Sequence, residues 1–437
     1  MARELSIRQM WDDLAFPQLM QSFHLALGPT KIILAFFMVS LIALFGICLD
    51  ALTRSVVIHP QADSPFFRVN GQVELSYPDE LTAYISNADH AVEFINAYRE
   101  SDKRKGVFFT LWNFIASRFN NATTRLLKLG TSNVFANLWN VFANIWLCFR
   151  ALAWAVQYHP LYSLFFFSFT VLVVCFFGGG ICRCAALEFA RNEKPGLTEA
   201  IQYSREQFKN LLSAPLLPTG ILTVFASIII LIGWAGNCPW MGELLIAVAF
   251  LPLLLLGLIM ALLIFASLSG ATLLFPAVVY ERTTGLDAIG RSFSYVLNQP
   301  LWMVFYTLVE ITLGTLFYLF IRLLVFVILS ITYTLLSWGL FPAEDGIGKL
   351  QRIWSKPSFF YFINHSANPS AWSEIFAANL IYGIMLLLVA FVLALIVSFM
   401  FSSMTIIYSL MRKKVDKVDF DQVDIHLQNV ADSSHPA

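Results

Sequence analysis

The sequence predicts an all-α integral membrane protein of about six transmembrane helices, with interfacial amphipathic helices and a small α+β extracytoplasmic insertion. Of its 437 residues, 58% are hydrophobic and only 13% are charged, and the mean hydropathy is +0.69. Several apolar runs reach the roughly 20 residues that a helix needs to cross a bilayer. So few charged residues cannot cover the surface, and lipid must therefore replace water around much of the chain.

Six apolar runs set the predicted organisation. The predicted spans are residues 32–52, 161–187, 214–234, 244–279, 301–336 and 371–411, the middle four forming a core at 161–338. No small-residue cleavage motif follows the first run, which is therefore interpreted as a retained span. We expect an amphipathic cytoplasmic segment at 1–31, an extracytoplasmic insertion with interfacial helices at 53–160, an extracytoplasmic connector at 339–370, and a cytoplasmic tail at 412–437.

The distribution of basic residues predicts the orientation. Lys and Arg gather before the first span and after the second, fourth and sixth spans, whereas the connector at 236–243 has none. Because cytoplasmic loops carry the excess of Lys and Arg, we expect a multi-pass protein of a bacterial inner membrane with both termini in the cytoplasm. Lys349, Arg352 and Lys356, in the predicted outer connector, oppose this orientation locally.

The predicted insertion begins with a hairpin and a helix. Residues 66–69 and 72–75 alternate as strands do, and they flank Asn70-Gly71, a pair that tolerates the positive φ angles of a tight turn. A helix should begin near Pro78, because Pro, Asp and Glu suit the first turn and apolar residues then recur at helical spacing.

A heptapeptide repeat follows within the insertion. The sequence Asn-Val-Phe-Ala-Asn-(Leu/Ile)-Trp occurs twice in succession over residues 133–146. On a helix, Asn133, Asn137, Asn140 and Asn144 form one polar stripe. Two interpretations are open: an interfacial helix with its asparagines toward water, or an asparagine seam that packs on another helix or on a second copy of the chain.

Two ionisable residues lie inside the fifth span. Glu310 is about ten residues into it and is the acid nearest the midplane, whereas Arg322, three turns further on, is expected to reach the outer interface through its flexible stem. If functional, Glu310 would face a cavity or partner, or be protonated, in a pathway for an ion or proton. If structural, it would make a packing hydrogen bond between helices.

The sequence lacks the common enzyme and cofactor motifs. It has no glycine-rich phosphate loop, His-Glu-x-x-His, Cys-x-x-Cys or Gly-x-Ser-x-Gly, and its seven histidines fall outside the predicted spans, where they cannot ligate an intramembrane haem. Equal numbers of basic and acidic residues, 28 each, give no basis for nucleic-acid binding. We therefore expect no catalysis, cofactor or metal.

An internal repeat marks the predicted core. Residues 195–204, after the second span, resemble residues 284–292, after the fourth. Each segment has a turn with Gly and then a short amphipathic helix. Because both segments lie on the predicted cytoplasmic side, the duplication is parallel, unlike the inverted repeats common in secondary transporters.

The second of these segments carries a family resemblance. Residues 275–296 are similar to the pattern Pro-x-x-x-x-Glu … Ala-x-x-Arg-Ser, matched at Pro276, Glu281, Arg291 and Ser292, with Asp287 between them. This pattern is found in uncharacterised bacterial multispan proteins: the YciC-like group, the membrane domain attached to some glycerophosphodiester phosphodiesterases, and hypothetical membrane proteins of planctomycete-type bacteria. The resemblance covers about 160–340. It implies a helical membrane domain without an agreed activity, since the phosphodiesterase chemistry belongs to a separate soluble barrel.

The motif also has a structural interpretation. Glu281 with Arg282, and Asp287 with Arg291 at i, i+4, are expected to pin the short helix at the membrane surface. Pro276 is expected to bend the end of the span.

The leading functional hypothesis is a non-catalytic structural or accessory subunit of a larger membrane assembly. Its expected partners are membrane lipids and either other membrane subunits or further copies of the chain. The alternatives are a transporter or channel for an ion or small molecule that uses Glu310, and a lipid-handling membrane protein.

Overall fold

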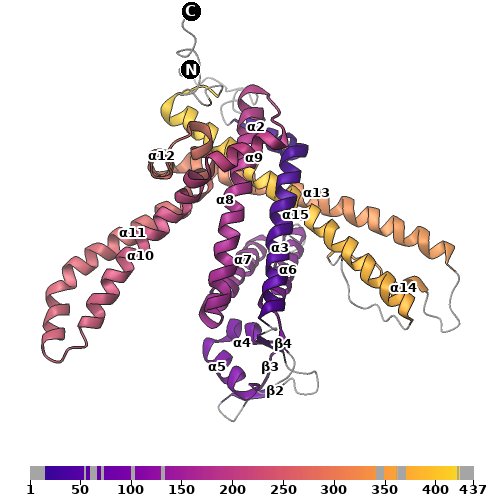
Figure 1. The fold of residues 1–437 in the computed structure, drawn as a ribbon, viewed down its shortest axis with the longest axis horizontal. Helices are drawn as coiled ribbons and strands as arrows, with labels where there is room; N and C mark the ends of the chain where they lie inside the picture. Colours follow the sequence, from indigo (N-terminus) through magenta and orange to yellow (C-terminus); the bar gives the residue numbers. More distant parts are fainter. Residues whose placement is uncertain are drawn as a thin grey trace, which may run out of the picture. The chain divides into compact units, whose positions relative to one another are not determined.

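A computed structural model describes residues 15–53, 56–59, 66–69, 73–99, 104–128, 133–340, 349–360, 362, 371–420 and 423. These residues are predominantly helical, with seven helices long and apolar enough to cross a membrane, which confirms the predicted class (Figure 1). The chain divides into two units, Met1–Val39 with Leu172–Ala437 and Ser40–Val171, here called the first and second units.

The six predicted spans are found as long helices. They are α3 (Pro29–Leu52), α8 (Pro160–Arg191), α10 (Phe208–Ala235), α11 (Met241–Glu281), α13 (Pro300–Gly339) and α15 (Trp372–Asp416). Prolines open three of them, as expected where the proline's missing N–H costs no helical bond. Arg282 and Lys417 end α11 and α15 in the left-handed conformation, with φ of 48° and 57°.

A seventh helix of spanning length, α7 (Val134–Tyr158), lies within the segment predicted as an interfacial insertion. The span count is therefore one higher than about six by length and composition. α7 is the least apolar of the seven, because it contains the asparagine repeat and Arg150. The interfacial position of this helix stays a prediction.

Shorter helices pack among the long helices of the first unit. α2 (Phe16–Ala26) is amphipathic, as predicted for the N-terminal segment, and it packs on α13 and α15, where Phe23 contacts Phe317 and Phe399. α9 (Leu197–Glu206) and α12 (Gly285–Asn298) follow α8 and α11, which confirms the predicted helix after each span. α14 (Lys349–Ile353) contacts α15.

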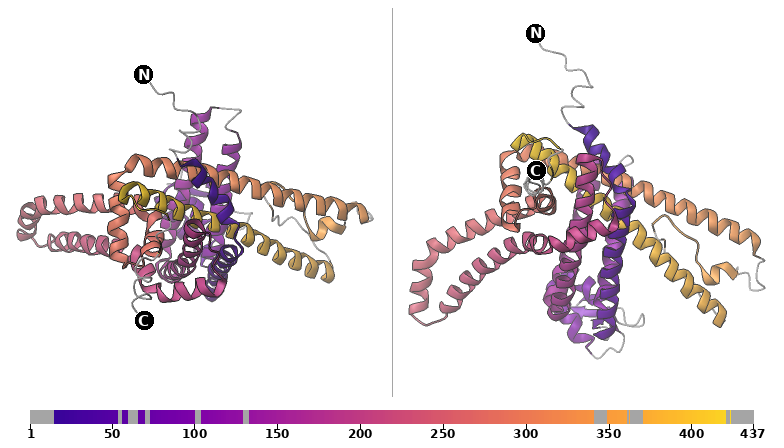
Figure 2. Two further views of the ribbon diagram at one scale, coloured as in Figure 1. Left: turned by 90° about the horizontal axis from the view of Figure 1, so that it is seen from above. Right: turned by 45° about the horizontal axis from the view of Figure 1, so that its top comes forward.

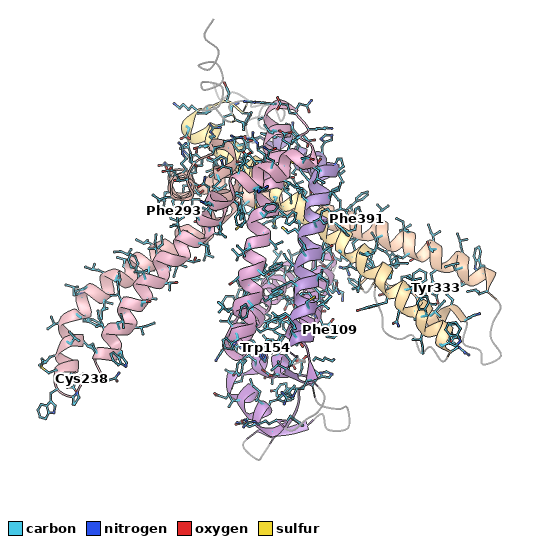
Figure 3. All side chains as sticks on the ribbon, viewed as in Figure 1. Phe109, Trp154, Cys238, Phe293, Tyr333 and Phe391 are labelled. Atoms are coloured by element: carbon cyan, nitrogen blue, oxygen red, sulfur yellow. The ribbon has the colours of Figure 1, made fainter. Side chains whose placement is uncertain are left out.

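Helices α10 and α11 form a hairpin within the first unit (Figure 2). Cys238 lies at its tip, and side chains project outward from both helices (Figure 3). The turn needs glycine, because a Cβ on Gly242 would lie 2.2 Å from the carbonyl oxygen of Gly236. The hairpin therefore depends on close backbone contact at its tip.

The second unit contains the strands and the helices of the insertion. β1 (Val57–Ile58) pairs with β4 (Arg104–Lys105), and β2 (Phe66–Val69) pairs with β3 (Val73–Ser76), both antiparallel. The second pair confirms the predicted hairpin strands; Asn70-Gly71 lies outside the described residues. α6 (Val107–Leu127) packs against α7.

The helix predicted after Pro78 is two helices, α4 (Glu80–Ser86) and α5 (Ala88–Ala97). Asp79 caps α4 by accepting the Thr82 N–H at 2.8 Å, in agreement with the predicted start. Asn87 then accepts the N–H of Asp89, which starts a new helix and interrupts the apolar periodicity.

Candidate functional site

The family-like motif forms a polar cluster at the ends of α11, α12 and α15. The carboxylate of Glu281, the last residue of α11, accepts from Arg291 Nη1 at 2.8 Å and lies 2.6 Å from Arg291 Nε. The Tyr408 hydroxyl donates to the same carboxylate at 2.8 Å, and Arg412 Nε lies 3.7 Å away. Glu281 therefore joins the consecutive helices α11 and α12 to α15, which is distant in sequence.

A second contact completes this cluster. The Tyr295 hydroxyl of α12 donates to Asp416 at the end of α15. Burial is the main cause that raises the pKa of the Tyr295 phenol, and the hydrogen bond to Asp416 raises it further. The phenol therefore remains a neutral donor at physiological pH. Burial, the largest single effect, lowers the pKa of Arg291, but Glu281 together with Tyr408 and Tyr295 raises it above its ordinary value. The cluster combines fixed ion pairs with neutral hydroxyls, an arrangement that holds helix ends together.

The predicted pairing within the motif is wrong. Asp287 accepts from the Thr284 hydroxyl at 2.7 Å, because it lies in the first turn of α12 beside the capping residue, and Arg291 is thereby free to pair with Glu281. Arg282 lies over the Tyr203 ring at 5.5 Å. Buried Ser292 donates to the carbonyl of Ala288.

Pro276 lies inside α11, which continues beyond it to Glu281. The two repeat segments share a burial pattern: Ala200 and Ser204 of α9, like Ala288 and Ser292 of α12, are buried at i, i+4. The repeat thus corresponds to equivalent packing faces.

Glu310 is buried in α13, with 5% of its surface exposed. Ser22 of α2 faces it, but the Ser22 hydroxyl donates to the carbonyl of Leu19 at 2.7 Å. Neither carboxyl oxygen of Glu310 has a hydrogen-bond partner among the residues that the structure describes. The predicted packing hydrogen bond between helices is therefore not found there, and Thr312 and Thr315 of the same helix donate back to its own carbonyls.

Arg322 does not extend to an exposed position as predicted; only 4% of it is exposed. Its Nε and Nη2 donate to the carbonyls of Phe359 and Phe360 at 2.8 and 2.7 Å. The guanidinium also lies within 6 Å of four ring centroids. These acceptors and rings replace water, so Arg322 fixes the segment after α14 against α13.

The asparagine stripe is only partly packed. Asn137 is buried and donates to the carbonyl of Lys128, directly after the end of α6. Asn144 donates to the carbonyl of Asn140 on its own helix, both are partly exposed, and Asn133 is exposed. One asparagine of four therefore supports the seam interpretation.

Sequence reasoning missed a buried ion pair in the first unit. Lys31 of α3, with 1% of its side chain exposed, donates to Glu188 of α8 at 2.5 Å. The available sequence signal was that Lys31 directly precedes the first predicted span and Glu188 directly follows the second, so both lie on the same predicted side of the membrane. Asp50, in contrast, accepts the N–H groups of Phe108 and Phe109 and caps α6, because the capping position is Gly106, which has no side chain to do so.

Within the described part of the chain, no three His, Cys, Asp or Glu residues are placed to hold a metal. The six cysteines are free, and Cys182 and Cys184 are buried.

Comparison of the chain with protein-family models, with curated proteins and with solved structures finds no match. The resemblance of residues 160–340 to the YciC-like group therefore stays a prediction. The structure itself defines the class: an α-helical, multi-pass membrane protein.

Proposed function

We propose that this protein is a non-catalytic structural or accessory subunit of a larger assembly in a bacterial inner membrane, with both termini in the cytoplasm. In this proposal α11 of the α10–α11 hairpin is the helix that contacts neighbouring subunits. The proposal rests on how little of this hairpin is covered by its own chain.

The observation that supports it is a contrast between the long helices. In α8 and α15, 39% of the most apolar 18-residue stretch is buried, whereas in α10 the share is 6% and in α11 it is zero. Helices associate in lipid through van der Waals packing, and the most apolar stretch of α11 has no residue buried by its own chain.

The hairpin also lacks the groups that chemistry or transport would require. Between Lys209 and Glu281 the sequence has a single Asp, Glu, Lys, Arg or His residue, Glu243, in the first turn of α11. Gly257 and Ala261 form a small-xxx-small pair, and a Cβ on Gly257 would meet nothing within 4 Å. Such a pair allows a second helix to approach closely.

The test is oligomer size combined with crosslinking. After mild detergent extraction, the full chain should migrate in a complex larger than one 49.3 kDa chain with its micelle. A photo-crosslinker at Leu254, one turn before Gly257, should attach to another protein chain. Gly257→Leu should reduce this crosslink, and Gly220→Leu, an equally open site on α10, should leave it unchanged. Migration as a single chain with lipid adducts alone would refute the proposal.

Glu310 supports a second candidate function, a transporter or channel for an ion or small molecule. The supporting observation is a buried acid whose carboxyl oxygens have no hydrogen-bond partner among the described residues. Glu310→Gln should then fold normally and abolish flux in reconstituted vesicles. Flux equal to that of the unmodified protein would exclude this role.

A further inference from the structure

An open groove of about 620 Å³ runs along one face of α10. Its lining includes Lys209, Ser213, Leu216, Gly220, Val224 and Phe225, which recur at helical spacing, and almost all of its surface is apolar. Gly220 deepens it because it has no side chain, and a Cβ there would meet no other atom within 4 Å.

The length of the groove fits one leaflet of a bilayer. From Lys209 to Phe225 a helix rises about 24 Å, which exceeds half of the roughly 30 Å hydrocarbon core and leaves room for the glycerol region. At the Lys209 end, α12 closes against α10, since a Cβ on Gly285 would lie 2.1 Å from Ser213 Oγ. The start of α12 therefore lies beside Ser213, near the end of the groove that carries its charge.

The charge at this end is a single cation. Lys209 is exposed, and no acidic side chain among the residues described lies within 4 Å of its ammonium. It lies at the second residue of α10, where the helix begins and where a lipid phosphate would be found.

We propose that this groove binds one anionic glycerophospholipid, with an acyl chain along α10 and its phosphate at the Lys209 ammonium. The apolar wall supplies shape and little selectivity, because lipid tails are as apolar as the side chains they contact. The headgroup charge therefore decides which lipid binds. One lysine near a membrane surface corresponds to about a fivefold preference for an anionic over a zwitterionic lipid.

This site is independent of the proposed assembly role, because it uses α10 and one lipid, whereas the assembly surface uses Gly257 on α11. Gly220→Leu fills the groove and Gly257→Leu leaves it open. Each variant is therefore the control for the other.

The experiment is native mass spectrometry of the full chain in detergent, titrated with phosphatidylglycerol or with phosphatidylcholine of the same acyl chains. We expect one lipid to bind, with about fivefold higher affinity for phosphatidylglycerol. Lys209→Gln should remove this preference, whereas Lys194→Gln, at an exposed loop lysine, should retain it. Gly220→Leu should abolish the single binding event, whereas Gly257→Leu should not.

Equal uptake of both lipids, or an unchanged preference in Lys209→Gln, would overturn the proposal. So would a photo-crosslinker at Leu216 that attaches to a stoichiometric protein chain, because the groove would then hold a helix. If Gly220→Leu does not fold, judged by circular dichroism, the pair Lys209→Gln and Lys194→Gln still decides the outcome.

Discussion

Replacing Glu188 by Gln should strongly destabilise the first unit, because it leaves a buried ammonium without its counter-ion. Lys31 Nζ lies 2.5 Å from Glu188 Oε2, and the two side chains are 1% and 5% exposed. Removing one partner of such a pair costs about 3–5 kcal/mol. His24, the other basic group near Glu188, is 3.8 Å away and 72% exposed, so it contributes little.

The same reasoning predicts that removing both charges is tolerated. Lys31→Met with Glu188→Leu replaces the pair by apolar side chains of similar size, and its cost should be at most about 1 kcal/mol, because the desolvation of both ions is also removed. The double variant should therefore be more stable than either Lys31→Met or Glu188→Leu alone, with a coupling energy of at least about 3 kcal/mol.

The assay is reversible unfolding of the full chain in mixed detergent micelles, followed by tryptophan fluorescence, for Glu188→Gln and for the four members of this cycle. Single variants that cost less than about 1 kcal/mol would show that water reaches Lys31 and would refute the reasoning. Additive costs in the double variant would show that the two charges do not interact.

Three further predictions concern the cluster, the cap and the topology. Glu281→Gln should cost about 1–2 kcal/mol in the same unfolding assay, because it removes the counter-ion of half-exposed Arg291, whereas Asp287→Asn should cost less than about 0.5 kcal/mol. Gly106→Ala should cost about 2 kcal/mol, because its Cβ would lie 1.9 Å from Asp50 Oδ2 and displace the cap of α6; Gly196→Ala, at an unobstructed capping position, should cost less than about 0.5 kcal/mol. Reporter fusions at the two termini should both give cytoplasmic activity if α7 lies along the interface, and termini on opposite sides would show that α7 crosses the membrane.

Much of the fold could be predicted because its determinants are local. Each of the six predicted spans agrees with a helix to within about six residues at either end, since the length of an apolar run directly sets whether a helix can cross lipid. The hairpin strands and the helix start near Pro78 were predictable for the same reason. α7 was not assigned as a span because its asparagines lower its apolarity.

For the candidate sites, the sequence predicted which residues take part, but it did not predict which of them contact one another. The motif identified Glu281 and Arg291, but it paired Arg291 with Asp287 on its own helix. Helical spacing makes the i, i+4 partner the natural expectation, and it cannot show which residue of another helix lies closer. Arg322 was placed at the interface for a similar reason, since the carbonyls that bind it are 37 and 38 residues further along the chain.

The sequence by itself determined that lipid surrounds much of this protein and which segments enter the bilayer. Both follow from the apolarity of consecutive residues. Tertiary structure alone decided which charges are neutralised and where. Lys31 meets Glu188 across 157 residues, Glu281 joins the ends of α11, α12 and α15, and Glu310 is buried beneath α2 without a hydrogen-bond partner among the described residues. These outcomes depend on the direction in which each side chain leaves its helix and on which helix packs beside it, and neither is encoded in a local pattern.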